Sequence, residues 1–229
     1  MRLTVLGNYG PYPTPDGNAS GYLVAENDSL LVVDLGSGTL RQLLRETDIR
    51  KVHHLYISHL HYDHTADLLP LRYLLEETGH SITVYVHRES TPYDTLLFNH
   101  PLLRVVDIDE HSTIELPAMR LSFLPMRHTV PDYAVRIEGE KTLCYTGDTL
   151  YNDNLPLCFQ KSDAVLADCS KPAGFHGPHM TVTHAARLAE AYPQVRLFAT
   201  HRGADFDPAP SLADYRNITV VQTGETYIL

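Results

Sequence analysis

The sequence predicts a four-layer αββα fold, in which two mixed β-sheets pack face to face and helices cover both outer faces. Three observations support this fold class. Short strand-like runs occur in both halves of the chain, helical stretches also occur in both halves, and 229 residues suit one domain with a sizeable buried core. Because no Pro/Gly-rich linker or low-complexity segment interrupts the pattern, we expect a single domain, 1–229.

The N-terminal half is predicted to begin with β-structure. Residues 3–6, 22–25 and 30–34 are mostly apolar, enriched in β-branched residues and flanked by Gly, Asn and Asp, a pattern typical of strands. Leucines at helical spacing predict a helix over 39–46, and the apolar run 54–58 reads as a short buried strand. The same criteria predict a helix over 64–77 that Pro70 kinks or delays, a strand over 82–87, a helix over 91–98 and a strand over 102–108.

The C-terminal half repeats this mixture of strands and helices. Short β-rich runs separated by turn residues predict strands, and one longer amphipathic stretch predicts a helix. The predicted strands are 120–126, 133–138, 141–146, 164–168, 195–200, 218–221 and 226–229, and the helix covers 181–192. The two halves resemble each other only at this coarse level.

Composition and charge exclude several classes of protein. No apolar run approaches the roughly 18 residues that a membrane helix needs, and the N-terminus has no secretory pattern, so we expect a cytoplasmic protein that does not bind membranes. Three cysteines without a C-x-x-C pair suit a reducing compartment. The net charge of −10 disfavours sequence-independent binding to nucleic acid phosphates.

Histidine is unusually frequent, with 14 residues, and the densest group is the string H-L-H-Y-D-H. It contains His59, His61, Asp63 and His64 and directly follows a predicted strand. Histidines at i and i+2 can converge on one metal ion while the following Asp-His pair serves a neighbouring ion. The string therefore predicts a two-metal site, and the alternative is a histidine-rich surface loop.

Three further residues stand just beyond predicted strands. His128 follows 120–126, Asp148 follows the run KTLCYTG, and His201 follows 195–200. Because loops at strand ends of a rigid scaffold usually carry binding residues, we expect one rim of the sheets to collect all of them.

These motifs resemble the metallo-β-lactamase superfamily over almost the whole chain. The resemblance implies that His59, His61 and His128 bind one metal, that Asp63, His64 and His201 bind the other, and that Asp148 bridges both. It also implies a metal-bridging hydroxide as the nucleophile. Zn²⁺ is the first expectation for an imidazole-rich site, while Mn²⁺ or Fe also suits the carboxylates.

The opening GNYGPYP and the segment VVDLGSGTLRQLL resemble the ribonuclease Z and phosphodiesterase branch, which implies a small or single-stranded phosphodiester substrate. Transfer RNA is disfavoured, because only nineteen residues separate His128 from Asp148, where the processing enzymes of this branch carry a long arm. A homodimer is the assembly that relatives of this shape often form.

Candidate catalytic residues are Asp63, His179 and Tyr151. His179 resembles a branch histidine that contacts phosphate or assists proton transfer, and a loop residue beside a Thr181 helix cap is the alternative. Tyr151 stands where lactonase members carry a leaving-group tyrosine, or else it simply packs.

Other candidates have supporting positions. The segment Ala167–Ser170 replaces the branch's H-E-A-T and lacks its histidine, for which His176 could compensate unless it is an exposed loop residue. Asp34 and Asp67 are candidates for orienting a ligand histidine, with a salt bridge and a helix N-terminal acid as their respective alternatives.

Two other functions stay open at this point. The first is a lactonase or carboxylic ester hydrolase that uses the same hydroxide on a carbonyl, and Tyr151 is its only specific support. The second is a non-catalytic metal-binding regulatory module, which the retention of all seven ligand types disfavours.

Overall fold

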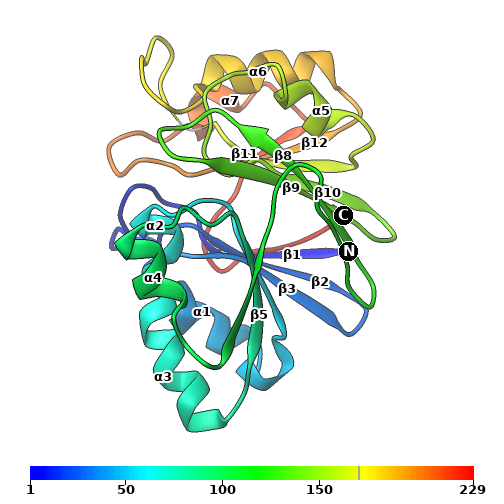
Figure 1. The fold of residues 1–229 in the computed structure, drawn as a ribbon. Helices are drawn as coiled ribbons and strands as arrows, with labels where there is room; N and C mark the ends of the chain where they lie inside the picture. The colour runs from blue at the N-terminus through cyan, green and yellow to red at the C-terminus, as the bar shows by residue number, and fades with distance from the viewer. Residues whose placement is uncertain (170) are drawn as a thin grey trace.

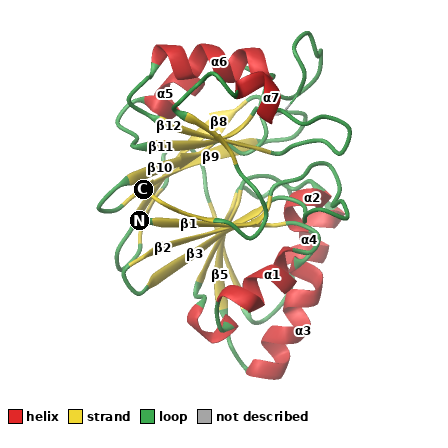
Figure 2. Ribbon diagram, turned by 180° about the vertical axis from the view of Figure 1, so that it is seen from behind, coloured by secondary structure: helices red, strands yellow, loops and turns green. Residues whose placement is uncertain are grey.

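The computed structural model describes residues 1–169 and 171–229. Two seven-stranded sheets pack face to face, with helices on the outer face of each, so the predicted four-layer fold class is confirmed. Figure 1 shows α1, α3 and α4 beside the first sheet and α5, α6 and α7 beside the second. Figure 2 shows the same layers from behind, with the helices on the outside.

The first sheet has the order β14-β1-β2-β3-β4-β5-β6. β1 to β3 are antiparallel, and β3 to β6 run parallel to their neighbours. The last strand of the chain pairs with β1, which brings the two termini close together (Figure 1). The strands are β1 (Arg2–Gly7), β2 (Gly21–Glu26), β3 (Ser29–Leu35), β4 (His54–Ile57), β5 (Ile82–Val86), β6 (Leu103–Asp107) and β14 (Thr226–Ile228).

The second sheet has the order β13-β12-β11-β10-β9-β8-β7. It is parallel from β10 to β13 and antiparallel from β7 to β10, so each sheet is mixed. Its strands are β7 (Thr113–Glu115), β8 (Arg120–Met126), β9 (Asp132–Glu138), β10 (Thr142–Tyr145), β11 (Ala164–Asp168), β12 (Arg196–Thr200) and β13 (Ile218–Val220).

The helices differ from the sequence prediction at one informative point. Instead of one helix over 64–77, the chain forms two helices separated at Ala66 and Asp67, and Pro70 lies in the first turn of the second one, where its missing N–H costs no helical hydrogen bond. β7, α5 and α7 were not predicted, because segments of three to five residues carry too little periodicity. The helices are α1 (Thr39–Glu46), the 3₁₀ helix η1 (Ile49–Lys51), α2 (Tyr62–Thr65), α3 (Leu68–Thr78), α4 (Pro92–Phe98), α5 (Leu155–Phe159), α6 (Val182–Ala191) and α7 (Ala209–Leu212).

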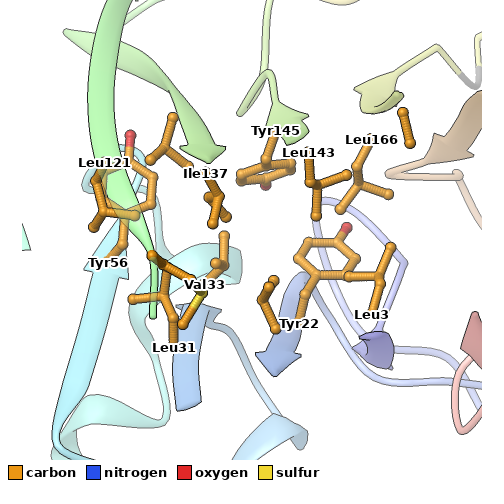
Figure 3. Close-up of a cluster of buried hydrophobic side chains, with 14 of the residues drawn as sticks. Leu3, Tyr22, Leu31, Val33, Tyr56, Leu121, Ile137, Leu143, Tyr145 and Leu166 are labelled. Carbon is orange, nitrogen blue, oxygen red and sulfur yellow. The ribbon is translucent and has the colours of Figure 1, made fainter. Parts of the chain in front are cut away.

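Apolar side chains fill the space between the sheets. Leu31 and Val33 of the first sheet face Leu121 and Ile137 of the second, as Figure 3 shows. Separate clusters lie between each sheet and its own helices. Burying apolar surface on both faces of each sheet is the main favourable contribution to folding, and it fixes the strand ends that carry the site. Among the described residues, no helix combines the length and apolar character that crossing a membrane requires.

Two tyrosines connect this core to the polar residues at its edge. The rings of Tyr22 and Tyr145 lie 5.2 Å apart in the core (Figure 3), and the Tyr22 hydroxyl lies 2.6 Å from the Thr200 hydroxyl, next to His201. Burial raises the pKa of Tyr145 well above its ordinary value, so its phenol stays protonated and donates to Asp34 over 2.7 Å. The core thus orders polar groups of both sheets.

Candidate metal centre

The histidine string lies where the chain changes from strand to helix. β4 ends at Ile57, His61 has an extended backbone, and the residue after it begins α2, which contains Asp63 and His64. This change of backbone conformation turns the four polar side chains toward one place, as the sequence predicted. His59 and His64 are fully buried, with ring centroids 4.1 Å apart.

Three imidazoles form the first group of donors. Nε2 of His59 lies 3.0 Å from Nδ1 of His61, and Nε2 of His128 lies 3.1 Å from the same atom. A tetrahedral ion with bonds of about 2.0–2.2 Å holds its ligand atoms roughly 3.3–3.6 Å apart, so these nitrogens are close to a coordinating arrangement.

A second group comes from α2 and from the end of β12. Nε2 of His201 lies 3.1 Å from Oδ2 of Asp63, and Nε2 of His64 lies 3.6 Å from that oxygen. His201 has a left-handed backbone with φ 59°, which bulky residues rarely adopt. A Cβ at Gly10 would lie 2.0 Å from the His201 ring, so this ring position requires glycine at residue 10.

Asp148 is shared by the two groups. Its Oδ2 lies 3.0 Å from Nε2 of His201 and 3.4 Å from Nε2 of His64, and 3.9 Å from Nε2 of both His59 and His128. In each group, one ligand atom per residue can be chosen so that all lie within 4.8 Å of one another. The structure therefore brings together all seven residues that the sequence singled out as ligands.

The electrostatics of these residues suit metal ions. Burial lowers the pKa of His59 to about 3 and that of His61 to about 4, so both imidazoles are neutral and offer lone pairs. Burial opposes charge on Asp148, yet the His201 and His64 imidazoles hold the pKa of its carboxyl well below its ordinary value. Within the described part of the chain, Nε2 of His64 and Oδ1 of Asp148 are buried without hydrogen-bond partners. Such atoms are costly unless something binds them, and bound cations satisfy them.

Asp34 orients one of the histidines, which confirms the sequence expectation. Its buried carboxylate accepts hydrogen bonds from Nδ1 of His64 at 2.7 Å and from the backbone N–H and the hydroxyl of Ser58, both at 2.8 Å. With Nδ1–H donating to Asp34, Nε2 of His64 is left free to bind a metal.

Asp132 plays the same part for His59, and sequence reasoning missed it. Its Oδ2 lies 2.8 Å from Nδ1 of His59, and the same oxygen accepts from the backbone N–H of Asp148 at 3.0 Å. A Cβ at Gly147, whose φ is 60°, would lie 2.2 Å from this carboxylate, so glycine admits it. Asp132 is the first residue of β9 and follows His128 closely in the chain, and this position was the sequence signal that could have identified it.

His179 reaches the same centre from the loop before α6. Its Nδ1 lies 2.8 Å from Oδ2 of Asp168 and 3.8 Å from Oδ2 of Asp148, and its ring stacks on His201 at 5.0 Å. Asp168 was also missed as a site residue, although it ends a predicted strand. Ser170, the last residue of the Ala167–Ser170 segment compared with H-E-A-T, lies outside the described residues. His176 is an exposed loop residue. Thr181 also caps α6, as the alternative reading expected.

Asp67 and Tyr151 make other contacts. The expectation that Asp67 orients a histidine is wrong: its Oδ2 accepts from the backbone N–H of Leu40 at 2.8 Å, at the start of α1, where a carboxylate also complements the helix dipole. Tyr151 is 43% exposed, and its ring packs at 5.2 Å against that of His184, in the first turn of α6.

The two-sheet sandwich and the buried His/Asp cluster at its strand ends assign the chain to the class of metal-dependent hydrolases. The chain belongs to the beta-lactamase superfamily, since the sequence profile of the beta-lactamase superfamily domain matches residues 31–202. The divalent-metal chemistry of such hydrolases agrees with the donor groups described above.

Individual relatives agree with this assignment. The probable metallo-hydrolase YhfI of Bacillus subtilis is 29% identical over 211 residues, which cover 88% of this chain and 86% of the relative. The crystal structure of the metallo-beta-lactamase fold protein YhfI matches with a TM-score of 0.91 at 25% identity, covering 99% of this chain and 98% of that one.

Two further matches are a ribonuclease and a diphosphatase. Ribonuclease Z of Haloarcula marismortui is 41% identical over 68 residues, 30% of this chain and 22% of the relative. A diphosphatase of the PhnP family has a TM-score of 0.81 at 20% identity over 100% of this chain and 97% of its own, a likeness that shows the fold alone.

Proposed function

We propose that the protein is a hydrolase with two metal ions that acts on a small or single-stranded phosphodiester. The observation that carries this proposal is the position of Asp148 between two complete donor groups. His59, His61 and His128 would hold one ion, Asp63, His64 and His201 the other, and Asp148 both. Imidazole-rich donors favour Zn²⁺, and Mn²⁺ or Fe would also suit the carboxylates.

Two bound divalent ions would supply an activated water and would stabilise charge that develops on the reacting group. The chain itself keeps the His59 and His61 imidazoles neutral, as metal binding requires, and pairs His64 and His59 with carboxylates. Asp34 and Asp132 hold the protons of His64 and His59 on Nδ1, so that Nε2 of each ring points to the ion site. Asp63, which we also singled out as catalytic, bonds to His201 and fixes that ring.

His179 is the proposed proton donor to the leaving oxygen. Its Nδ1 is engaged by Asp168, so Nε2 is the atom that can carry and release a proton. Stacking on His201 and contact with His128 place the ring beside both donor groups. Asp168 stands at the position of the acid in the compared H-E-A-T segment, and Ala167 stands at the position of its histidine.

The phosphodiester substrate is proposed from the similarity to ribonuclease Z. We propose a small substrate rather than transfer RNA. The residues between His128 and Asp148 are largely the adjacent antiparallel strands β9 and β10, which leave no room for a protruding arm. The net charge of −10 points the same way. We also propose that the chain works as one domain, because both sheets contribute donors.

A substrate panel tests the proposal. Purified protein loaded with Zn²⁺ is assayed against bis(4-nitrophenyl) phosphate and against a homoserine lactone. We expect turnover of the phosphodiester, and a Tyr151→Phe variant should retain it because this exposed ring packs on His184. Turnover of the lactone alone, lost in the same variant, would replace our proposal by a lactonase.

A further inference from the structure

A cavity of about 530 Å³ opens directly beside the metal centre. His61 and Asp63 are among its lining residues, so a molecule bound there would meet the ion-binding residues. Leu60 and Tyr93 provide apolar wall, and Glu89 is the acidic side chain of the lining that does not belong to the proposed ligand set. The volume suits a small organic group, and such pockets usually combine apolar walls with a few orienting polar groups.

One carboxylate oxygen of the half-buried Glu89 is unsatisfied. Its Oε1 is shielded from solvent and has no hydrogen-bond partner within the described part of the chain. Burial raises the pKa of this carboxyl, which reflects the same poor solvation. A buried acceptor without a donor costs free energy, and a ligand that supplies a donor removes this cost.

The backbone that carries Glu89 is fixed by a dedicated set of contacts. Ser90 has a left-handed φ of 56°, which is rare for a residue other than glycine. The buried Asp94 carboxylate accepts from the Ser90 N–H at 2.9 Å and from Nε of Arg88 at 2.6 Å, while Thr91 caps α4. Strained backbone that is held by its surroundings is concentrated at functional sites. The contacts of Asp94 therefore hold an unfavourable backbone conformation at Ser90, and this conformation positions Glu89 in the cavity lining.

The aromatic wall adds the second feature of the ligand. Tyr62 and Tyr93 contact each other edge to face with centroids 4.8 Å apart, and both line the cavity. Flat rings pack well against such a pair. The cavity thus offers an ion centre for an anionic group, an aromatic wall for a ring, and an acceptor for a donor on that ring.

We propose that Glu89 is a specificity-determining residue that accepts a hydrogen bond from an N–H or O–H donor on the organic group of the substrate. The substrates are then phosphate esters whose ring carries such a donor, and a second anionic group on the ring is disfavoured. The inference rests on the proposed function only for the anionic group that faces the metal ions.

Binding of three matched phosphonates to the Zn²⁺-loaded protein tests this proposal by calorimetry. The ligands are phenylphosphonate, 4-(aminomethyl)phenylphosphonate and 4-carboxyphenylphosphonate, whose para positions carry a hydrogen atom, a cationic ammonium donor and an anionic carboxylate. We expect the aminomethyl compound to bind about tenfold tighter than phenylphosphonate, and the carboxy compound to bind most weakly, because a hydrogen bond to a charged acceptor is stronger than a neutral one. Glu89→Gln should remove most of both differences.

Glu77→Gln is the matched control, since it makes the same chemical change on an exposed side chain of α3. It should keep the wild-type order of affinities. Equal affinities of the three ligands in the wild type, no binding of any of them, or an unchanged preference in Glu89→Gln would overturn the proposal. Because binding needs no turnover, a failure to hydrolyse any phosphodiester would count against the proposed function alone.

Discussion

Replacing Asp34 by Asn tests how the core supports the metal centre. The Asp34 carboxylate accepts four hydrogen bonds, from the N–H and hydroxyl of Ser58 and from His64 and Tyr145, at 2.7 to 2.8 Å. Asn tolerates the left-handed φ of 55° at this position, so the backbone should stay in place. The Asn side chain keeps one acceptor oxygen, but its NH₂ group takes the place of Oδ2. It then faces the Ser58 hydroxyl, Nδ1 of His64 and the Tyr145 hydroxyl, which in the wild type bond to Oδ2.

The expected cost follows from these contacts. A buried hydrogen bond to a charged group contributes about 1.5–3 kcal/mol, and at least one is lost, so the free energy of unfolding should fall by about 2–4 kcal/mol. Nδ1 of His64 can bond to the new NH₂ only as an acceptor, which places the ring proton on Nε2, the atom that faces the ion site. Zn²⁺ affinity should therefore fall about 10–100-fold, as is typical when a ligand's orienting partner is changed.

Urea unfolding of the metal-free protein and competition for Zn²⁺ with a chromogenic chelator measure the two effects. Asp67→Asn is the control, because Asp67 is also an acid that bonds to the backbone, at Leu40, but it contacts none of the histidines in the described structure. It should lower stability without changing Zn²⁺ affinity. Wild-type Zn²⁺ affinity in Asp34→Asn would refute the reasoning.

The remaining predictions address the site itself. Asp148→Ala should abolish hydrolysis and lower metal content, measured by elemental analysis, because its carboxylate is shared by both groups; near wild-type activity would refute a two-ion site. His179→Ala should lower kcat while metal content stays at the wild-type value, since it acts on the leaving group; loss of metal would show that it is a ligand. Gly10→Ala should displace His201, because the new Cβ would lie 2.0 Å from its ring, and should lower metal content in the same analysis. An unchanged content would contradict this steric argument.

The donor residues could be predicted because their signal is local. Three histidines and an aspartate within six residues are rare, and a strand immediately before them predicts that they gather at a sheet edge. His128, Asp148 and His201 could be found because each follows a run of strand-forming residues. The parallel strands and long helices were predictable for the same reason, as their hydrophobic patterns are strong.

The supporting residues could not be predicted in the same way. Asp132 orients His59 from a distant segment of the chain, and Asp168 orients His179 across the loop before α6. Neither aspartate belongs to the string H-L-H-Y-D-H. Asp67 was assigned wrongly because it is close to His64 in sequence. In the structure its carboxylate instead bonds to a backbone N–H group at the start of α1, which has no partner within that helix. Glu89 belongs to a loop whose left-handed Ser90 leaves no pattern in the sequence.

Anomalous X-ray scattering at the zinc edge, from crystals of the Zn²⁺-loaded protein, tests the central claim most directly. Our account predicts two peaks roughly 3.5 to 4 Å apart, one among His59, His61 and His128 and the other among Asp63, His64 and His201, with Asp148 between them. A single peak, or two peaks that do not share Asp148, would contradict it.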